Sequence, residues 1–188
     1  MFPRKLLNIL ILITVLTTSA SGQVITHSAA IGGVKVRFKN AQNEPGDAEK
    51  QWREAIDLLK ADIGNAAKDK DKEESYFYLG AVYYRKFDFG NAVDAFTKAL
   101  TFGKKHFEDG EKLSGGVVLF SIKESMNDIK LKVFTQANRA YNDALGMTNP
   151  DSARLDSVRK LLYKSIDKFR QVLLWDSLAF INGKSYTT

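Results

Sequence analysis

The side chains that could do chemistry in this chain are few, and none falls into a familiar catalytic pattern. There are two histidines and no cysteine, which excludes thiol catalysis, disulfide bonds and cysteine-bound metal ions. No His-Glu-x-x-His helix, phosphate-binding loop or Gly-x-Ser-x-Gly turn occurs. The residues that could pair for general acid–base catalysis are the carboxylates Glu73, Glu74, Asp109 and Glu111. Without a cleft these are ordinary surface acids, so the sequence predicts no enzyme, no cofactor and no metal site.

Neither histidine has a neighbour in sequence that suits proton transfer or metal binding. His27 lies in a segment without helical spacing. His106 follows Lys104 and Lys105 at the expected end of a helix, where cations complement the helix dipole. Both histidines are therefore expected to face solvent.

The charge is mild and mixed in sign. The whole chain carries +6, and residues 23–188 carry 26 basic and 22 acidic side chains, an excess of +4. Acids and bases alternate along the later helices, for example at Lys123, Glu124, Asp128, Lys130 and Lys132. Because no long basic stripe forms, the sequence predicts no nucleic-acid binding.

The first 22 residues have the order of a secretory signal peptide. Arg4 and Lys5 precede an apolar run from Leu6 to Leu16, and small residues follow up to Gly22. We expect cleavage near Gly22/Gln23 and a periplasmic or secreted protein without a stable membrane span. An uncleaved anchor is the alternative, although the apolar run is short for a permanent span.

Residues 23–46 form a separate segment in the sequence. Val34, Val36 and Phe38 alternate with basic residues, which is the two-residue period of a strand. This pattern predicts a short extended N-terminal arm, with a partly ordered lead-in as the alternative. Pro45 and Gly46 then predict a turn, and Asp47 is placed to cap the helix that opens a domain over residues 47–176.

Apolar residues recur at three- and four-residue spacing through that domain and predict about five helices. The first carries Trp52, Ala55, Ile56, Leu59 and Ile63. A long helix after the break at 113–116 carries Ile122, Met126, Ile129, Val133, Ala137, Ala140 and Ala144. Its stripe is widened by Leu131, Phe134, Tyr141 and Leu145, which predicts contact with two neighbours. Asn149 and Pro150 open the last helix, whose inward face is predicted to be Leu155, Val158, Leu162, Ile166, Phe169 and Val172 or Leu173.

Residues 73–106 carry the most specific pattern. Counted from Glu73, eight apolar or small residues fall at fixed places over two helices: Tyr76, Leu79, Gly80, Tyr83, Phe89, Ala92, Phe96 and Ala99. This 34-residue segment resembles the tetratricopeptide repeat, a helix-turn-helix unit, although Lys104 stands where the family has proline. Flanking segments resemble degenerate repeats, one around Trp52, Ala55 and Leu59 and one around Ser165, Phe169 and Val172.

The resemblance implies an all-α, right-handed array of antiparallel helical hairpins. It also implies a concave face that holds a peptide, lined here by Glu74, Phe77, Ala81, Tyr84 and Arg85. The alternative is that Phe77 and Tyr84 belong to the core. The family's clamp for a free chain terminus has Lys and Asn at the places of Phe77 and Ala81, so that mode of recognition is not expected.

The sequence therefore predicts an exported, non-enzymatic helical repeat module that binds a protein or peptide in an envelope or secreted assembly. An accessory protein that grips a glycan or another small ligand by aromatic stacking is the alternative, and an enzyme is less favoured. The C-terminal tail, residues 177–188, is expected either to cap the array next to Trp175 or to contact a second copy in a homo-oligomer.

Overall fold

The computed structural model of the chain describes residues 25–146 and 152–183, and this part is helical almost throughout. This confirms the prediction of an all-α fold. The elements are α2 (His27–Asn43), the short 3-10 helix η1 (Pro45–Asp47), α3 (Ala48–Asn65), α4 (Asp69–Arg85), α5 (Phe89–Phe102), α6 (Lys105–Glu108), β1 (Glu111–Lys112), β2 (Val118–Leu119), α7 (Ile122–Leu145) and α8 (Ser152–Gly183). The predicted signal peptide and the Asn149–Pro150 helix start lie outside the described residues.

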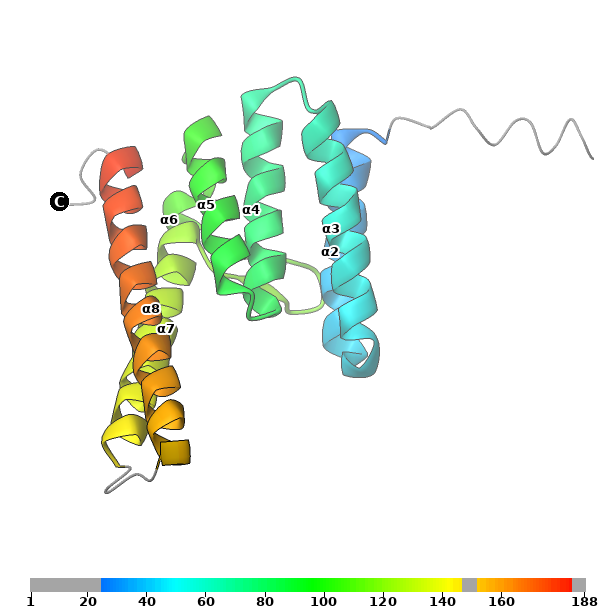
Figure 1. The fold of residues 1–188 in the computed structure, drawn as a ribbon. Helices are drawn as coiled ribbons and strands as arrows, with labels where there is room; N and C mark the ends of the chain where they lie inside the picture. The colour runs from blue at the N-terminus through cyan, green and yellow to red at the C-terminus, as the bar shows by residue number, and fades with distance from the viewer. Residues whose placement is uncertain (1–24, 147–151, 184–188) are drawn as a thin grey trace, which may run out of the picture.

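Consecutive long helices pack against each other in pairs: α2 with α3, α4 with α5, and α7 with α8 (Figure 1). The partners in a pair run in opposite directions. Tyr76 near the start of α4 stacks on Phe102 at the end of α5, with ring centroids 5.7 Å apart. At the other end of the pair, Tyr84 lies 6.4 Å from Phe89.

Helix α2 replaces the predicted N-terminal arm, so the prediction of an extended segment over 23–46 is wrong from His27 onward. The buried residues of α2 are Ala30, Ile31, Val34, Phe38 and Ala41. They follow the three- and four-residue spacing of a helix that packs on one face. The strand-like alternation came from Val36, which is 53% exposed. Packing of this face against α3 and α4 outweighs the strand preference of the valines.

The core lies around α4. Its largest fully buried side chains include Phe38 of α2, Leu59 of α3, Phe77 and Tyr78 of α4, and Phe96 of α5. The eight residues that resemble the repeat signature lie on α4 and α5, where they are buried in this core or pack against it. The Gly80 backbone lies directly against the Phe96 ring, because a Cβ at Gly80 would sit 2.5 Å from the ring atoms Cδ1 and Cε1.

The connection between α5 and α7 folds back over α4. It contains α6 and a two-stranded antiparallel hairpin in which Glu111 pairs with Leu119 and Lys112 with Val118. Gly115 and Gly116 make the turn with φ values of +82° and +79°, a region that favours glycine. Leu113, Val117 and Leu119 of this connection are buried in the core.

The α7–α8 pair is the longest part of the molecule, and its loop end extends beyond the other helices (Figure 1). Ser121 and Glu124 form a reciprocal capping box at the start of α7. Helix α8 continues without a break to Gly183, so it includes the first residues of the segment 177–188 that was predicted to form the C-terminal tail. Trp175 is buried in the core. None of the described helices combines the length and the apolar composition needed to cross a membrane.

We expect Gly80→Ala to lower the free energy of unfolding by about 2 kcal/mol, because overpacking against the buried Phe96 ring outweighs the helix preference of alanine. Gly32→Ala on α2 is the matched control, since a Cβ there meets nothing within 4 Å. The control should gain about 0.5–1 kcal/mol. Urea unfolding of both variants measures the difference. Equal stabilisation by both would contradict the close approach of α4 and α5.

Candidate functional site

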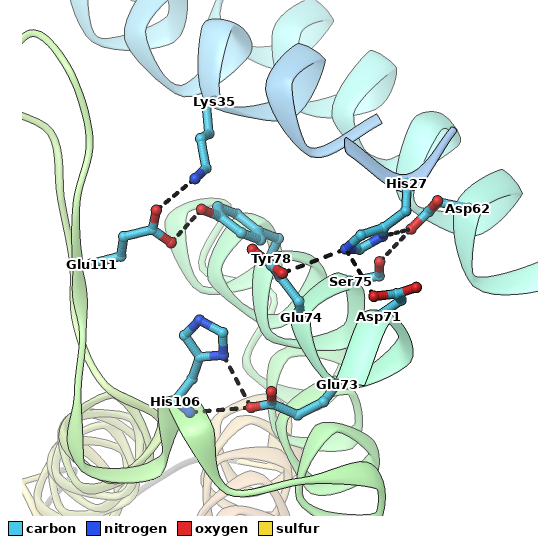
Figure 2. A network of polar contacts seen from close by, with 10 residues as sticks. All are labelled: His27, Lys35, Asp62, Asp71, Glu73, Glu74, Ser75, Tyr78, His106 and Glu111. Carbon is cyan, nitrogen blue, oxygen red and sulfur yellow. Dashed lines mark hydrogen bonds and ion pairs between the residues drawn. The ribbon is translucent and has the colours of Figure 1, made fainter. Parts of the chain in front are cut away.

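The residues predicted to line an open binding face all lie on α4, but most of that face is covered by the chain itself. Phe77 has no exposed surface and Ala81 is 6% exposed. The prediction of an open groove is therefore corrected at these two residues, which belong to the core. Glu74, Tyr84 and Arg85 remain at least partly exposed to solvent, but their side chains contact other parts of the chain. Three polar clusters show how neighbouring segments cover α4 (Figure 2).

The first cluster holds α6 against α4. The His106 ring stacks on Phe77 at 4.1 Å with an interplanar angle of 7°. Glu73 Oε1 accepts hydrogen bonds from the His106 backbone N–H at 3.1 Å and from its Nδ1 at 3.0 Å. Burial by itself raises the pKa of Glu73, but the bonds from His106 outweigh it and hold that pKa below its usual value. The prediction that His106 faces solvent is wrong, because its partner lies 33 residues earlier in the chain.

The second cluster holds β1 against α4 and α2. Tyr78 Oη donates a hydrogen bond to Glu111, and Lys35 Nζ lies 2.6 Å from Glu111 Oε1. Burial and then the Glu111 carboxylate raise the pKa of Tyr78, so this phenol stays protonated. Burial raises the pKa of Glu111, but Lys35 and Tyr78 together lower it below its usual range. The cluster thus joins three segments through one carboxylate.

The third cluster joins α2, α3 and α4. His27 Nδ1 lies 2.7 Å from Asp62 Oδ2, and His27 Nε2 lies 3.4 Å from Glu74 Oε2 and 3.9 Å from Asp71 Oδ1. Ser75 Oγ donates to the same Asp62 oxygen at 2.5 Å. The prediction that His27 faces solvent is wrong, because only 21% of its side chain is exposed and both of its ring nitrogens lie close to carboxylates. Burial lowers the pKa of His27, but the carboxylates, Asp62 first, outweigh this and raise it above its usual value.

These clusters have the geometry of structural contacts. A serine nucleophile needs a histidine that accepts its proton, but Ser75 and His27 both bond to Asp62 and not to each other. Among the described residues, no three His, Cys, Asp or Glu side chains are arranged to hold a metal ion. The arrangement of hydrogen bonds therefore fixes α2, α3, α6 and β1 on α4.

Tyr84 and Arg85 contact the elements that follow α5. Tyr84 Oη donates to Asp128 at 2.7 Å, and Lys132 Nζ donates to Tyr84 Oη at 3.2 Å. Arg85 Nη2 donates to the backbone oxygen of Val118 at 2.7 Å. Burial raises the pKa of Tyr84, and the bond to Asp128 raises it further. Both predicted binding residues thus hold β2 and α7 in place.

Phe87 is unusual in two respects at the turn between α4 and α5. Its side chain is 72% exposed, and its φ of 58° lies in the left-handed region that favours glycine. Hydrogen bonds from Phe87 N to Tyr84 O and from Asp88 N to Tyr83 O impose this conformation where α4 ends. Phe120, which follows β2, is 46% exposed, and its ring lies 6.3 Å from that of Tyr84. The backbone turn therefore presents a large aromatic ring to solvent at a cost in strain.

Among the side chains that the structure describes, the largest group of exposed apolar ones lies on α7 and α8. On α7 these are Leu131, Phe134, Tyr141 and Leu145, and on α8 they are Leu155, Tyr163, Ile166, Leu173 and Leu174. The prediction that α7 touches two neighbours is confirmed, because α7 packs against α8 and also contacts α4, α5 and α6. The prediction that Leu155 and Ile166 face inward is wrong, since 51% and 43% of their surfaces are exposed. We call the surface formed by the exposed residues Leu131, Phe134, Tyr141, Leu145, Leu155 and Ile166, together with the half-buried Leu162, the α7–α8 face.

Comparison of the chain with protein-family models, with curated proteins and with solved structures found no match.

Phe87→Gly is expected to raise the free energy of unfolding by about 0.5–1 kcal/mol, because glycine adopts a positive φ without strain. Phe87→Ala is the control that removes the ring and keeps the strained conformation, and it should give no such gain. Thermal unfolding followed by circular dichroism measures both. If Phe87→Ala stabilises as much as Phe87→Gly, the backbone is not the source of the strain.

The His27 cluster should make stability depend on pH. Because the folded pKa of His27 is raised, its contribution is complete below pH of about 6.5 and is lost as the pH rises through the folded value. Wild type should therefore exceed His27→Gln in melting temperature by about 1–4 °C near pH 6, and by less near pH 8.5. A difference that grows with pH would contradict the assignment.

Proposed function

We propose that this chain is an exported, non-enzymatic helical repeat module that binds a protein partner through its α7–α8 face, as a component of an envelope or secreted assembly. The export signal in residues 1–22 and the tetratricopeptide-like pattern of residues 73–106 support the export and the scaffold parts of the proposal. They also favour binding over catalysis, because repeats of this kind present surfaces to partners.

The observation that carries the proposal is the exposure of large apolar side chains on the α7–α8 face. Leu131 is 64% exposed and Leu145 is 61% exposed. Scattered apolar side chains are normal on a protein surface, but contiguous rows of them on one helical pair are typical of interaction sites. Aromatic residues, here Phe134 and Tyr141, are also enriched at the centres of protein interfaces.

The position of this face also supports binding. The loop half of the pair extends away from the core, so a partner can reach it without displacing α6 or the β1–β2 hairpin from α4. The face on α4 is filled by those elements. We therefore place the partner on α7 and α8 and not on the five α4 residues that the sequence favoured.

The alternative is an accessory protein for a glycan or another small ligand. The exposed rings of Phe87 and Phe120 are the feature that favours it, because sugars stack on exposed aromatic rings. A panel of saccharides that raises the melting temperature of wild type and not of Phe87→Ala would support this alternative.

The test of the proposal is a crosslinked pull-down from the exported fraction of the cells that make the protein. Leu155→Ser, Ile166→Ser is the double variant, chosen because 51% and 43% of these side chains are exposed and their loss should not disturb folding. Val36→Ser, an equally exposed apolar residue on α2, is the control. We expect the double variant to capture at least about tenfold less of a specific protein than wild type and the control.

Circular dichroism checks that all three proteins are folded. Equal capture by wild type and by the folded double variant would contradict the use of the α7–α8 face.

A further inference from the structure

The exposed apolar residues of α7 repeat with the period of a helical interface. Leu131, Phe134, Tyr141 and Leu145, with the half-buried Asn138 among them, are separated alternately by three and four residues. This spacing aligns them in one row along the helix, since residues three and four apart are neighbours on a helix surface. The row lies beside the buried residues Ile129, Val133, Ala137 and Ala140, which face the interior.

A second row runs along α8. Leu155, Leu162, Ile166 and Phe169 are separated by seven, four and three residues, so they also fall on one side of the helix. A hollow of about 410 Å³ opens along this row, lined by Leu155, Val158, Arg159, Leu162, Tyr163 and Ile166. From Leu155 to Phe169 the row is about 21 Å long, or about four helical turns.

The two rows lie on the same side of the pair. Phe134 and Phe169 stand at the inner edges of their rows, and their ring centroids are 5.4 Å apart in an edge-to-face contact. We call the hollow along the α8 row, together with the adjoining α7 row, the groove. An apolar surface of this kind accepts the apolar side of a third helix.

The charges beside the groove determine which charge a bound partner helix should carry. Between residues 155 and 175, α8 carries five basic side chains, Arg159, Lys160, Lys164, Lys168 and Arg170, and two acidic ones, Asp156 and Asp167. Arg159 and Arg170 lie next to the apolar row, at helical positions just outside Leu155, Ile166 and Phe169. Arg159 lies 3.4 Å from Asp156, but both side chains are about 70% exposed, so this contact holds the guanidinium weakly.

A second copy of the chain does not supply the complementary charge. The outer flank of the α7 row carries the exposed residues Thr135, Arg139 and Asn142. Asp128 lies on the same flank seven residues before Thr135, but it is already bonded to Lys132 and Tyr84. Two copies packed face to face would therefore place basic and neutral flanks together. An acidic flank must come from a different protein.

We propose that the groove of the α7–α8 face binds an amphipathic helix of a partner protein, about four turns long, whose apolar row is flanked by Asp and Glu residues. This inference rests on the proposed function of the same face and names the chemistry of its partner. Arg159 and Arg170 are the residues that distinguish acidic from basic helices.

Two designed, fluorescently labelled helical peptides with the same leucine row are the probes, one with Glu and the other with Lys at the flanking positions. Fluorescence anisotropy with the mature chain is expected to show the Glu peptide binding about tenfold more tightly at low salt, with a smaller difference in about 0.5 M salt. Arg159→Glu, Arg170→Glu should invert this preference. Lys160→Glu, Lys164→Glu, an equal charge change on the opposite side of α8, should leave it unchanged.

The outcomes separate this inference from the proposed function. If Leu155→Ser, Ile166→Ser loses the captured protein while charge reversal at Arg159 and Arg170 leaves peptide preference unchanged, the acidic helix is overturned and the proposed function stands. If neither peptide binds and the apolar variant keeps its partner, both are overturned.

Two other occupants of the groove would also overturn the inference. One is a second copy, shown by sedimentation as a wild-type dimer that Leu155→Ser, Ile166→Ser dissociates. The other is a membrane, shown by binding to vesicles of phosphatidylcholine and phosphatidylserine without binding to either peptide.

Discussion

The burial of helix α4 is the constraint on which the rest of the structure depends. Six consecutive residues, from Phe77 to Val82, are buried, so this helix has no solvent side over nearly two turns. A helix that is apolar all round needs neighbours on every side. In this fold α2, α3, α5, α6 and α7 all contact α4, and the β1–β2 hairpin bonds to it through Glu111. The same requirement explains why no open groove is left on α4.

A part of the fold could be predicted from the sequence where the residues that determine it lie close together in the chain. The α4–α5 pair was predictable because the small Gly80 and the large Phe96 lie close in sequence and complement each other. Helix α2 was not, because Val36 and the basic residues imitate a strand while the partners of its buried face lie on α3 and α4. The apolar run in α4 already indicated that the predicted binding face is core. Phe77, Ala81 and Val82 extend the apolar surface of the helix beyond a single side.

The polar clusters around α4 show why the partners of the charged side chains could not be predicted from the sequence alone. Glu73 with His106 and Glu111 with Tyr78 are each separated by 33 residues, so nothing nearby in the chain marks them as partners. Buried ionic contacts of this kind contribute little net stability compared with apolar packing. Their geometry instead specifies where the connection between α5 and α7 lies on α4, because a shifted connection would leave a buried carboxylate without its donors.

The extension of the α7–α8 pair beyond the core has an evolutionary consequence. The later half of α8 is anchored through the buried Trp175, whereas the side chains of its first half that face solvent support nothing else in the described chain. Substitutions at these exposed positions carry little folding cost, so this surface can change in sequence while the rest of the fold stays constant. Divergence among descendants of this chain should therefore concentrate at the exposed positions of the α7–α8 face, and α4 should diverge most slowly.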